Sequence, residues 1–141
     1  MYTIALIDKN NIKSIIPFLE MLDNSIDANT LEARLDEMIA QGYQCVGVYD
    51  ENELIGISGL WTLTKYYVGK HIEPDNVFIL PKYQGKGIGE LLLDWIFDYA
   101  KSIGCNASEL NCYIDNDKAH KFWKNRGYEI KAYHFQKKFN K

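Results

Sequence analysis

The stretch that decides the fold is Val77-Phe78-Ile79-Leu80-Pro81-Lys82-Tyr83-Gln84-Gly85-Lys86-Gly87-Ile88-Gly89-Glu90-Leu91-Leu92-Leu93. It begins with a run of β-branched and aromatic residues that ends at Pro81, which is typical of a buried strand. From Ile88 to Ile103 the apolar residues recur with helical spacing, and charged residues occupy the other side. We therefore predict a strand, a glycine-rich turn and an amphipathic helix in direct succession.

The turn carries three glycines, Gly85, Gly87 and Gly89. Without Cβ atoms the backbone can approach a ligand, and free N–H groups of a helix N-terminus converge there beside a partial positive charge. The junction suits a phosphate or pyrophosphate, although a tight turn alone also uses glycine. Two other phosphate motifs do not fit, because Gly85-Lys86 is not followed by Ser or Thr and the glycine spacing differs from a dinucleotide fingerprint.

Two motifs resemble those of the GCN5-related N-acetyltransferase (GNAT) superfamily. Its acyl-CoA loop, Gln/Arg-x-x-Gly-x-Gly/Ala, is similar to Gln84-x-x-Gly87-x-Gly89. Its second signature, Asn-x-x-Ala-x-x-Phe-Tyr-x-x-x-Gly-Phe, is similar to Asn116-x-x-Ala119-x-x-Phe122-Trp123-x-x-x-Gly127-Tyr128. Together the motifs cover about the last half of the chain, and the first half matches the family only in the order of its elements.

The resemblance implies one N-acetyltransferase domain over residues 1–141, in the α/β (α+β) class. We expect the GNAT fold, a mixed and mostly antiparallel sheet with helices on both faces, in the order β-α-α-β-β-β-α-β-α-β. The expected strands lie at 2–7, 43–49, 54–63, 75–80, 108–114 and 128–139. The expected helices lie at 12–22, 31–40, 88–103 and, after a cap at Asp115 or Asn116, through 124.

Local signals refine these elements. Pro17 is expected to kink the first helix or split it. Asn29, with Glu32 three residues later, resembles a capping box for the second helix. Alternation along the strand before the glycine loop places Asp75, Val77 and Ile79 on one face and Asn76, Phe78 and Leu80 on the other.

The composition limits the classes of function. No apolar run approaches the roughly 18 residues of a membrane span, and the chain does not open on a signal-like tract, so we expect a cytoplasmic protein without a membrane partner. Three cysteines without a Cys-x-x-Cys pair indicate neither a disulfide framework nor a zinc site, and we expect no metal. The sequence pI of about 5.6 disfavours nucleic acid.

The net charge of −3 is unevenly distributed. Residues 1–75 hold 12 acids and 5 bases, a net −7, whereas residues 76–141 hold 7 acids and 11 bases, a net +4. A basic half beside a phosphate-type loop fits an anionic cofactor, and an acidic half fits a cationic acceptor. For any single charged residue, solvation of the surface is the simpler interpretation.

The resemblance implies acetyl-CoA as the cosubstrate. In the family, pantetheine pairs with the strand before the glycine loop, which assigns this role to backbone groups of Phe78, Ile79 and Leu80, with one amide of that run donating to the thioester oxygen. The pyrophosphate is expected at Gln84, Gly85, Lys86, Gly87, Ile88 and Gly89.

The second motif adds further contacts and one departure. Asn116 resembles the residue that contacts the pantetheine arm, and Lys118 or Lys121 is placed to reach cofactor phosphates. Trp123 stands where many members of the family carry a tyrosine that protonates the leaving thiolate, and an indole N–H cannot supply a proton at useful pH. Tyr113 is our first substitute as the acid, unless the thiolate leaves unaided. The other substitutes are His120, Tyr83 and His134.

An amine acceptor requires a base. An alkyl amine has a pKa of about 10.4, so roughly one molecule in a thousand is nucleophilic at neutral pH. Asp75 resembles an acidic position that some members of the family use, and Glu73 is the second choice. Either acid can instead order the strand or bind the cationic amine. Asp23 and Asp27 are further candidates for contact with the amine.

We predict an N-acetyltransferase (EC 2.3.1 class) that transfers an acetyl group from acetyl-CoA to a primary amine of a small molecule or peptide. Two alternatives stay open: acetylation of protein lysines, and a non-enzymatic sensor or scaffold that binds acetyl-CoA. An open acidic groove favours the first, and a closed aromatic pocket favours a small amine. Trp61, Tyr66 and Tyr67 are core, interface or the wall of such a pocket. We also expect a homodimer.

Overall fold

The computed structural model describes residues 1–139, which form two compact units, residues 1–108 and the residues from Glu109 onward. The described part of the second unit, up to residue 139, contains one helix, α4 (Asp117–Asn125). The first unit contains, in chain order, β1 (Tyr2–Leu6), a 3-10 helix (Lys9–Ile15), α1 (Ile16–Leu22), α2 (Ala28–Ala40), β2 (Gln44–Asp50), β3 (Glu53–Lys65), β4 (Gly69–Ile79), a second 3-10 helix (Pro81–Tyr83), α3 (Ile88–Ser102) and β5 (Ala107–Ser108).

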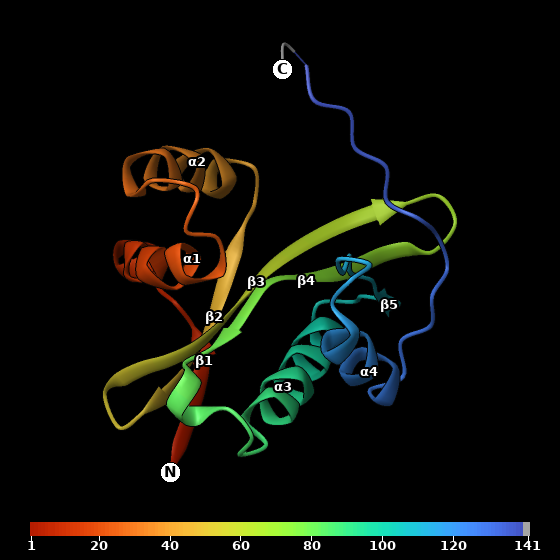
Figure 1. The fold of residues 1–141 in the computed structure, drawn as a ribbon. Helices are drawn as coiled ribbons and strands as arrows, with labels where there is room; N and C mark the ends of the chain where they lie inside the picture. The colour runs from red at the N-terminus through yellow and green to blue at the C-terminus, as the bar shows by residue number, and fades with distance from the viewer. Residues whose placement is uncertain (140–141) are drawn as a thin grey trace. The chain divides into compact units, whose positions relative to one another are not determined.

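The strands form one sheet in the order β1-β2-β3-β4-β5. The pairs β1–β2, β2–β3 and β3–β4 are antiparallel, and β5 runs parallel to β4. Within the first unit, α1 and α2 lie on one side of the sheet and α3 lies on the other (Figure 1). The predicted fold class, a mixed and mostly antiparallel sheet with helices on both faces, is confirmed.

Each face of the sheet carries its own apolar layer. On the side of α1 and α2, Ile15 and Leu35 are fully buried in a cluster that includes Cys45 and Ile57 of the sheet. Alternation turns Val46, beside Cys45, to the opposite face. The α3 residues that are buried are Ile88, Leu92, Leu93, Ile96 and Ala100.

Two helix starts show how local sequence sets the elements. Pro17 is accommodated in the first turn of α1, directly after the 3-10 helix, which confirms the predicted split of this region. The N-cap of α2 is Asp27, whose Oδ1 accepts a hydrogen bond from the Thr30 amide at 2.8 Å. The expected cap at Asn29 is therefore wrong, because the helix begins earlier and Asn29 lies in its first turn.

Strand β4 is longer than predicted. It begins at Gly69 and includes Pro74, which we expected to precede the strand. The Asn106 amide donates to the Lys70 carbonyl, so every second residue from Lys70, Pro74 included, turns its backbone groups away from β3. Proline is tolerated there because β3 does not need its missing N–H.

The two last predicted strands are wrong for most of their length. The strand expected at 108–114 is limited to β5, Ala107–Ser108, and no strand forms at 128–139 among the described residues. A strand needs a partner for its backbone groups, and an alternating sequence such as this one does not itself provide the partner.

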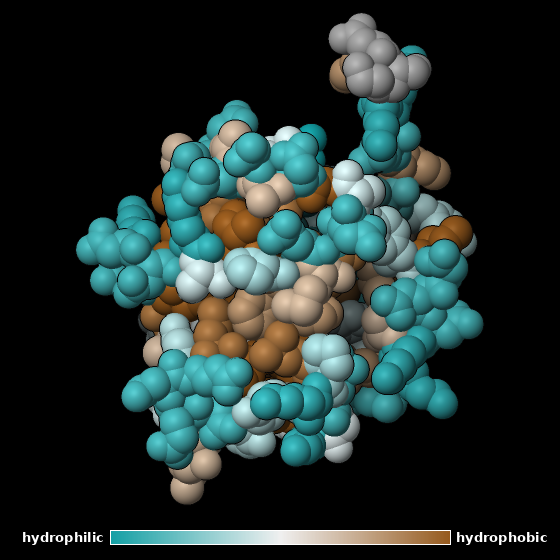
Figure 2. Space-filling model, turned by 60° about the vertical axis from the view of Figure 1, so that its left-hand side comes forward, coloured by the Kyte–Doolittle hydropathy of each residue, from teal (hydrophilic) through white to brown (hydrophobic). Residues whose placement is uncertain are grey.

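The face of the described chain that is drawn in Figure 2 is mostly polar. Figure 2 shows hydrophilic residues around a hydrophobic area on the face that it presents. Within residues 1–139, no helix combines the length and the apolar character that a membrane crossing requires.

Candidate acetyl-transfer site

Strand β4 contains a bulge opposite Ser58 of β3. Ile57 pairs with Phe78 and Gly59 pairs with Asp75, so β4 places one more residue in this interval than β3 does. The backbone of Asn76 is left-handed at this point, with φ of 54°. Asn76 thus occupies a conformation that glycine adopts far more readily.

The bulge changes which residues share a face. Because it adds one residue to β4, Asp75 and Phe78 both face the side of α1 and α2, although they are three residues apart. The predicted alternation, with Asp75 and Phe78 on opposite faces, is therefore wrong. The carboxylate of Asp75 accepts two hydrogen bonds, from the Trp61 indole at 3.0 Å and from the Asn76 amide at 2.9 Å.

Beyond the bulge, one edge of β4 carries no strand partner among the described residues. Strand β5 pairs only with His71 and Ile72 of β4. The Leu80 amide donates to the Ile55 carbonyl of β3, which turns the backbone groups of Ile79 and, two residues earlier, Val77 toward the open edge.

This geometry divides the three residues predicted to pair with pantetheine. Ile79 faces the open edge, whereas the backbone groups of Phe78 and Leu80 face β3. Val77 faces the edge and was missing from the prediction. The signal for it is the bulge, which the local sequence does not reveal. The Ile79 carbonyl accepts a hydrogen bond from Nε2 of Gln84 at 2.8 Å, so Gln84 braces the end of this edge.

The open edge leads directly into the glycine loop. Gly85 and Gly87 both have φ of 78°, and a Cβ built on either meets no protein atom within 4 Å. Gly87 is the N-cap of α3, and no side chain caps this helix end. The first amides of α3, at Ile88 and Gly89, therefore have no side-chain cap and lie at the positive end of a helix of 15 residues.

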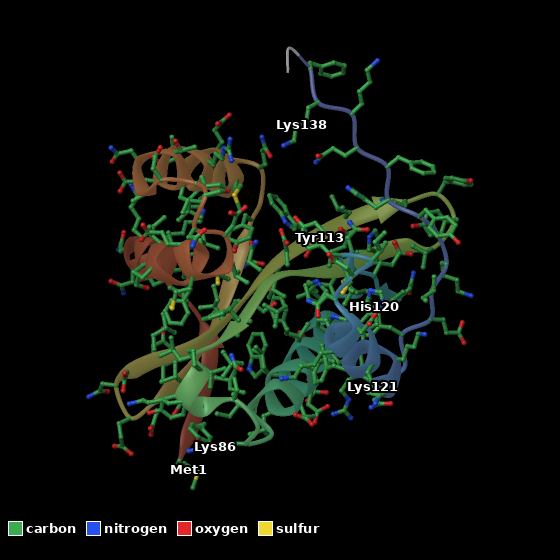
Figure 3. All side chains as sticks on the ribbon, viewed as in Figure 1. Met1, Lys86, Tyr113, His120, Lys121 and Lys138 are labelled. Atoms are coloured by element: carbon green, nitrogen blue, oxygen red, sulfur yellow. The ribbon has the colours of Figure 1, made fainter. Side chains whose placement is uncertain are left out.

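Tyr83 anchors the loop to the sheet. Its hydroxyl donates to Oδ2 of Asp50 at 2.6 Å, and this hydrogen bond, with burial, raises the pKa of Tyr83 to about 12. The Nζ atoms of Lys82 and Lys86 lie 5.4 and 5.6 Å from its ring centroid. Figure 3 shows Lys86 in the segment before α3. A phenol held in this way is poorly suited to protonate a leaving thiolate.

Comparison with known proteins identifies the family of the chain. Residues 16–128 match the acetyltransferase (GNAT) family. The chain belongs to this family. It is therefore an N-acetyltransferase, of class EC 2.3.1, which favours an enzyme over a non-enzymatic sensor.

Individual relatives agree with the family. "Uncharacterized N-acetyltransferase YhdJ" of Bacillus subtilis (strain 168) is 24% identical over 123 residues, which are 86% of this chain and 87% of the relative. Aminoalkylphosphonate N-acetyltransferase of Salmonella typhimurium is 32% identical over 65 residues, 46% of this chain and 42% of that protein. The solved aminoglycoside N-acetyltransferase AAC(6')-Iy in complex with CoA has the same fold, with a TM-score of 0.85, 14% identity and coverage of 99% and 95%.

A second acidic residue of the acetyltransferase lies beside Asp75 on β4. Glu73 pairs with Trp61 across the sheet and Asp75 pairs with Gly59, so both carboxylates are on the same face. Oε2 of Glu73 lies 2.7 Å from Nε2 of His71, whose side chain is fully buried. Both predicted candidates for the base are thus oriented by neighbours on the sheet.

The predicted acidic contacts on the helices serve local structure. Oδ1 of Asp23 accepts from the amide and the hydroxyl of Ser25, and Asp27 caps α2. The amide of Thr30 lowers the pKa of Asp27. Their role toward an amine stays a prediction.

The second unit carries the other predicted residues. Oδ1 of Asn116 accepts from the Ala119 amide at 3.1 Å and so caps α4. Nε2 of His120 donates to the Tyr113 carbonyl at 2.7 Å, and the Tyr113 side chain is exposed. The ring of Trp123 packs edge-on against those of Phe122 and Tyr128. Tyr113, His120 and Lys121 are marked in Figure 3.

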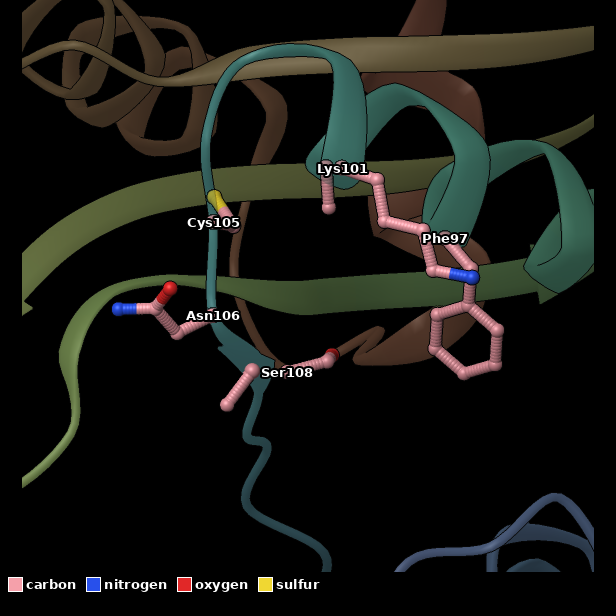
Figure 4. Close-up of a pocket in the computed structure, with 7 residues that line it drawn as sticks. Phe97, Lys101, Cys105, Asn106 and Ser108 are labelled. Carbon is pink, nitrogen blue, oxygen red and sulfur yellow. The ribbon is translucent and has the colours of Figure 1, made fainter.

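A pocket of the first unit lies apart from the predicted site residues. It is open and is drawn in Figure 4. None of the predicted site residues lines it. The residues that line it are Phe97, Ala100, Lys101, Cys105, Asn106, Ala107 and Ser108.

Proposed function

We propose that this acetyltransferase uses acetyl-CoA to acetylate a primary amine of a small molecule or peptide. One observation carries the proposal: the open edge of β4 runs into an uncapped helix N-terminus whose glycines leave space. An extended polar arm can pair with Val77 and Ile79 like an added strand, and a pyrophosphate fits the amides that follow Gly87.

The residues at the loop fit an anionic group on physical grounds. A side chain at Gly85 or Gly87 would project into the space that a ligand needs, and neither φ suits an L-residue. Gln84, Lys86 and the amides of Ile88 and Gly89 complete this proposed cradle. Asn116 keeps the contact with the pantetheine arm that the family resemblance implies, and we assign Lys121 to a cofactor phosphate.

The proposed reaction gives one role to the cosubstrate and one to each residue of the site. Acetyl-CoA supplies an acetyl group activated as a thioester. Asp75 accepts a proton from the ammonium, directly or through a water, so that the amine lone pair can form the new C–N bond. The Val77 amide donates to the carbonyl oxygen as negative charge develops on it. The C–S bond then breaks as the nitrogen releases its second proton to water, and the sulfur leaves as a thiolate or, with a proton from Tyr113, as a thiol.

The names of two similar proteins fit a small acceptor. One is an aminoalkylphosphonate N-acetyltransferase, and another is an aminoglycoside N-acetyltransferase. The acidic first half of this chain also favours a cationic acceptor. Acetylation of protein lysines remains the second candidate, and the experiment below separates the two.

Mass spectrometry tests the proposal directly. The protein is incubated with acetyl-CoA and a panel of small amines, polyamines and lysine peptides, and acetylated products are identified. We expect acetylation of at least one small amine, with Asp98→Asn as active as the wild type because Asp98 is an exposed acid of α3. If lysine peptides are the only acceptors, the same assay with intact proteins separates a peptide acceptor from the second candidate, and no product with any amine would contradict the proposal.

The role of Tyr113 has its own test. If Tyr113 is the acid, Tyr113→Phe slows turnover and shifts the high-pH limb of the rate profile, while Trp123→Phe acts through packing alone. A Tyr113→Phe enzyme with the rate and pH profile of the wild type would leave departure of an unassisted thiolate.

We also propose one functional domain over residues 1–141, a cytosolic location and a homodimer. The family match across residues 16–128 supports the single domain, because it includes parts of both compact units. Sedimentation velocity of the purified protein tests the dimer, and cell fractionation tests the location.

A further inference from the structure

The bulge in β4 requires something to hold it. Asn76 is one of two non-glycine residues with positive φ among residues 1–139. An L-residue in the left-handed region is less stable there than in the extended region, so a strand would relax without a specific contact. The bulge matters because it determines where the next backbone amide, that of Val77, points.

Tyr43 provides such a contact from a distant part of the chain. Its hydroxyl donates to Oδ1 of Asn76 at 3.2 Å, across 33 residues of sequence. The Tyr43 side chain is only 2% exposed, and burial raises its pKa, so the hydroxyl stays a donor. Its ring lies directly on Gly59, where an added Cβ would come within 2.4 Å of the hydroxyl oxygen.

Trp61 and Asp75 complete the enclosure. The Trp61 ring packs edge-on against Tyr43 with centroids 5.2 Å apart, and its indole N–H donates to Oδ2 of Asp75. Oδ1 of Asp75 accepts from the Asn76 amide. The backbone and the side chain of Asn76 are therefore both held, one by Asp75 and the other by Tyr43.

We propose that Tyr43 is a positioning residue for acetyl transfer: its hydroxyl holds Asn76 in the left-handed bulge, and the bulge directs the Val77 amide to the open edge. This inference rests on the proposed function, because it assigns the Val77 amide to the reacting carbonyl. Tyr43 itself touches no substrate in this scheme. Its effect therefore falls on turnover and reaches it only through Asn76.

The first test removes the hydroxyl and keeps the ring. Tyr43→Phe should lower kcat by about five- to tenfold, the loss expected when one hydrogen bond that aligns a donor is removed. KM for acetyl-CoA should change by less than about twofold, since the glycine loop is untouched. The Cα and Cβ chemical shifts of Asn76 should move toward extended values in NMR spectra, which requires no activity.

The second test keeps the left-handed backbone at residue 76 without the hydrogen bond from Tyr43. Glycine adopts the left-handed region without support, so Asn76→Gly should remove the need for Tyr43. In the N76G background, Tyr43→Phe should leave kcat unchanged within about twofold. Tyr99→Phe is the matched control, because it removes a tyrosine hydroxyl that donates to Gln44 at 3.0 Å elsewhere in the same unit.

The outcomes separate this inference from the proposed function. If no amine is acetylated, the proposed function fails, and the Asn76 shifts still report whether Tyr43 holds the bulge. Unchanged Asn76 shifts in a folded Tyr43→Phe protein would overturn the inference. An equal loss of kcat in the Asn76 and N76G backgrounds would also overturn it, because Tyr43 would then act by another route.

Discussion

The β4 bulge and the glycine loop both contain residues in the left-handed backbone region, but only the residue in the bulge is contacted by other side chains. At the bulge, Asn76 has φ of 54° and is enclosed by Tyr43 and Asp75. In the loop, Gly85 and Gly87 have φ of 78°, and a Cβ on either would meet no protein atom within 4 Å.

The two regions show two ways in which a protein can keep a left-handed backbone in a binding site. Asn76 carries a side chain in the left-handed region, which costs free energy, and its contacts with Tyr43 and Asp75 offset this cost. Glycine needs no such support, so the loop can keep its shape and leave its amides accessible. We infer that the β4 bulge orients the reacting groups and that the glycine loop binds the anion.

The largest expected effect comes from placing a negative charge in the glycine loop. Gly87→Asp should lower the affinity for acetyl-CoA by at least about a hundredfold, because a carboxylate would stand where the pyrophosphate binds. Calorimetry measures the dissociation constant, which we expect to be micromolar for the wild type. Gly87→Asn is the control of equal size without charge, and a loss equal to that of Gly87→Asp would contradict the electrostatic account.

The next largest effect concerns the carboxylate of Asp75 at the β4 bulge. Asp75→Asn should lower kcat/KM for an identified amine by about a hundredfold, as expected for loss of a positioned base. The dissociation constant of acetyl-CoA should stay unchanged in calorimetry. Glu73→Gln sharpens the assignment: a larger loss there than at Asp75 would transfer the role of the base to Glu73.

Crowding the bulge further should reduce stability. Gly59→Ala places a methyl group against the Tyr43 ring and should lower the free energy of unfolding by about 1–3 kcal/mol. Urea denaturation measures this change. In the Y43A background the same substitution should cost much less. Equal costs in both backgrounds would show that the ring of Tyr43 does not fill this space.

The smallest effect depends on pH and concerns the anchor of the loop. The hydrogen bond to Asp50 raises the pKa of Tyr83 to about 12, above about 10 in an unfolded chain. The folded protein thus keeps this proton longer, so the stabilisation is complete below pH 10 and is lost as pH rises from about 10 to about 12. Tyr83→Phe should lack this loss in denaturation curves, and a slope like that of the wild type would contradict the assignment.

The glycine loop could be predicted from sequence because its determinants are local. The strand, the glycines and the helical periodicity follow one another within one stretch, and the structure confirms α3 from Ile88. The split at Pro17 is local in the same sense, and it is also confirmed.

The bulge could not be predicted because its determinant is distant. Asn76 is held by Tyr43, 33 residues earlier, and alternation alone assigned the wrong faces to Asp75 and Phe78. The open edge at Val77 was missed for the same reason. The predicted strands at 108–114 and 128–139 show the converse limit, since their alternating pattern names no pairing partner.

The central claim is that acetyl-CoA binds along the open edge of β4 and at the start of α3. Titration of the ¹⁵N-labelled protein with acetyl-CoA tests it most directly, because each backbone amide reports its own contact. We predict large shift changes for the amides of Val77, Ile79, Ile88 and Gly89, and none for the amides of β1 at the far edge of the sheet. Binding that leaves the four amides unchanged, or that shifts β1 instead, would contradict the account.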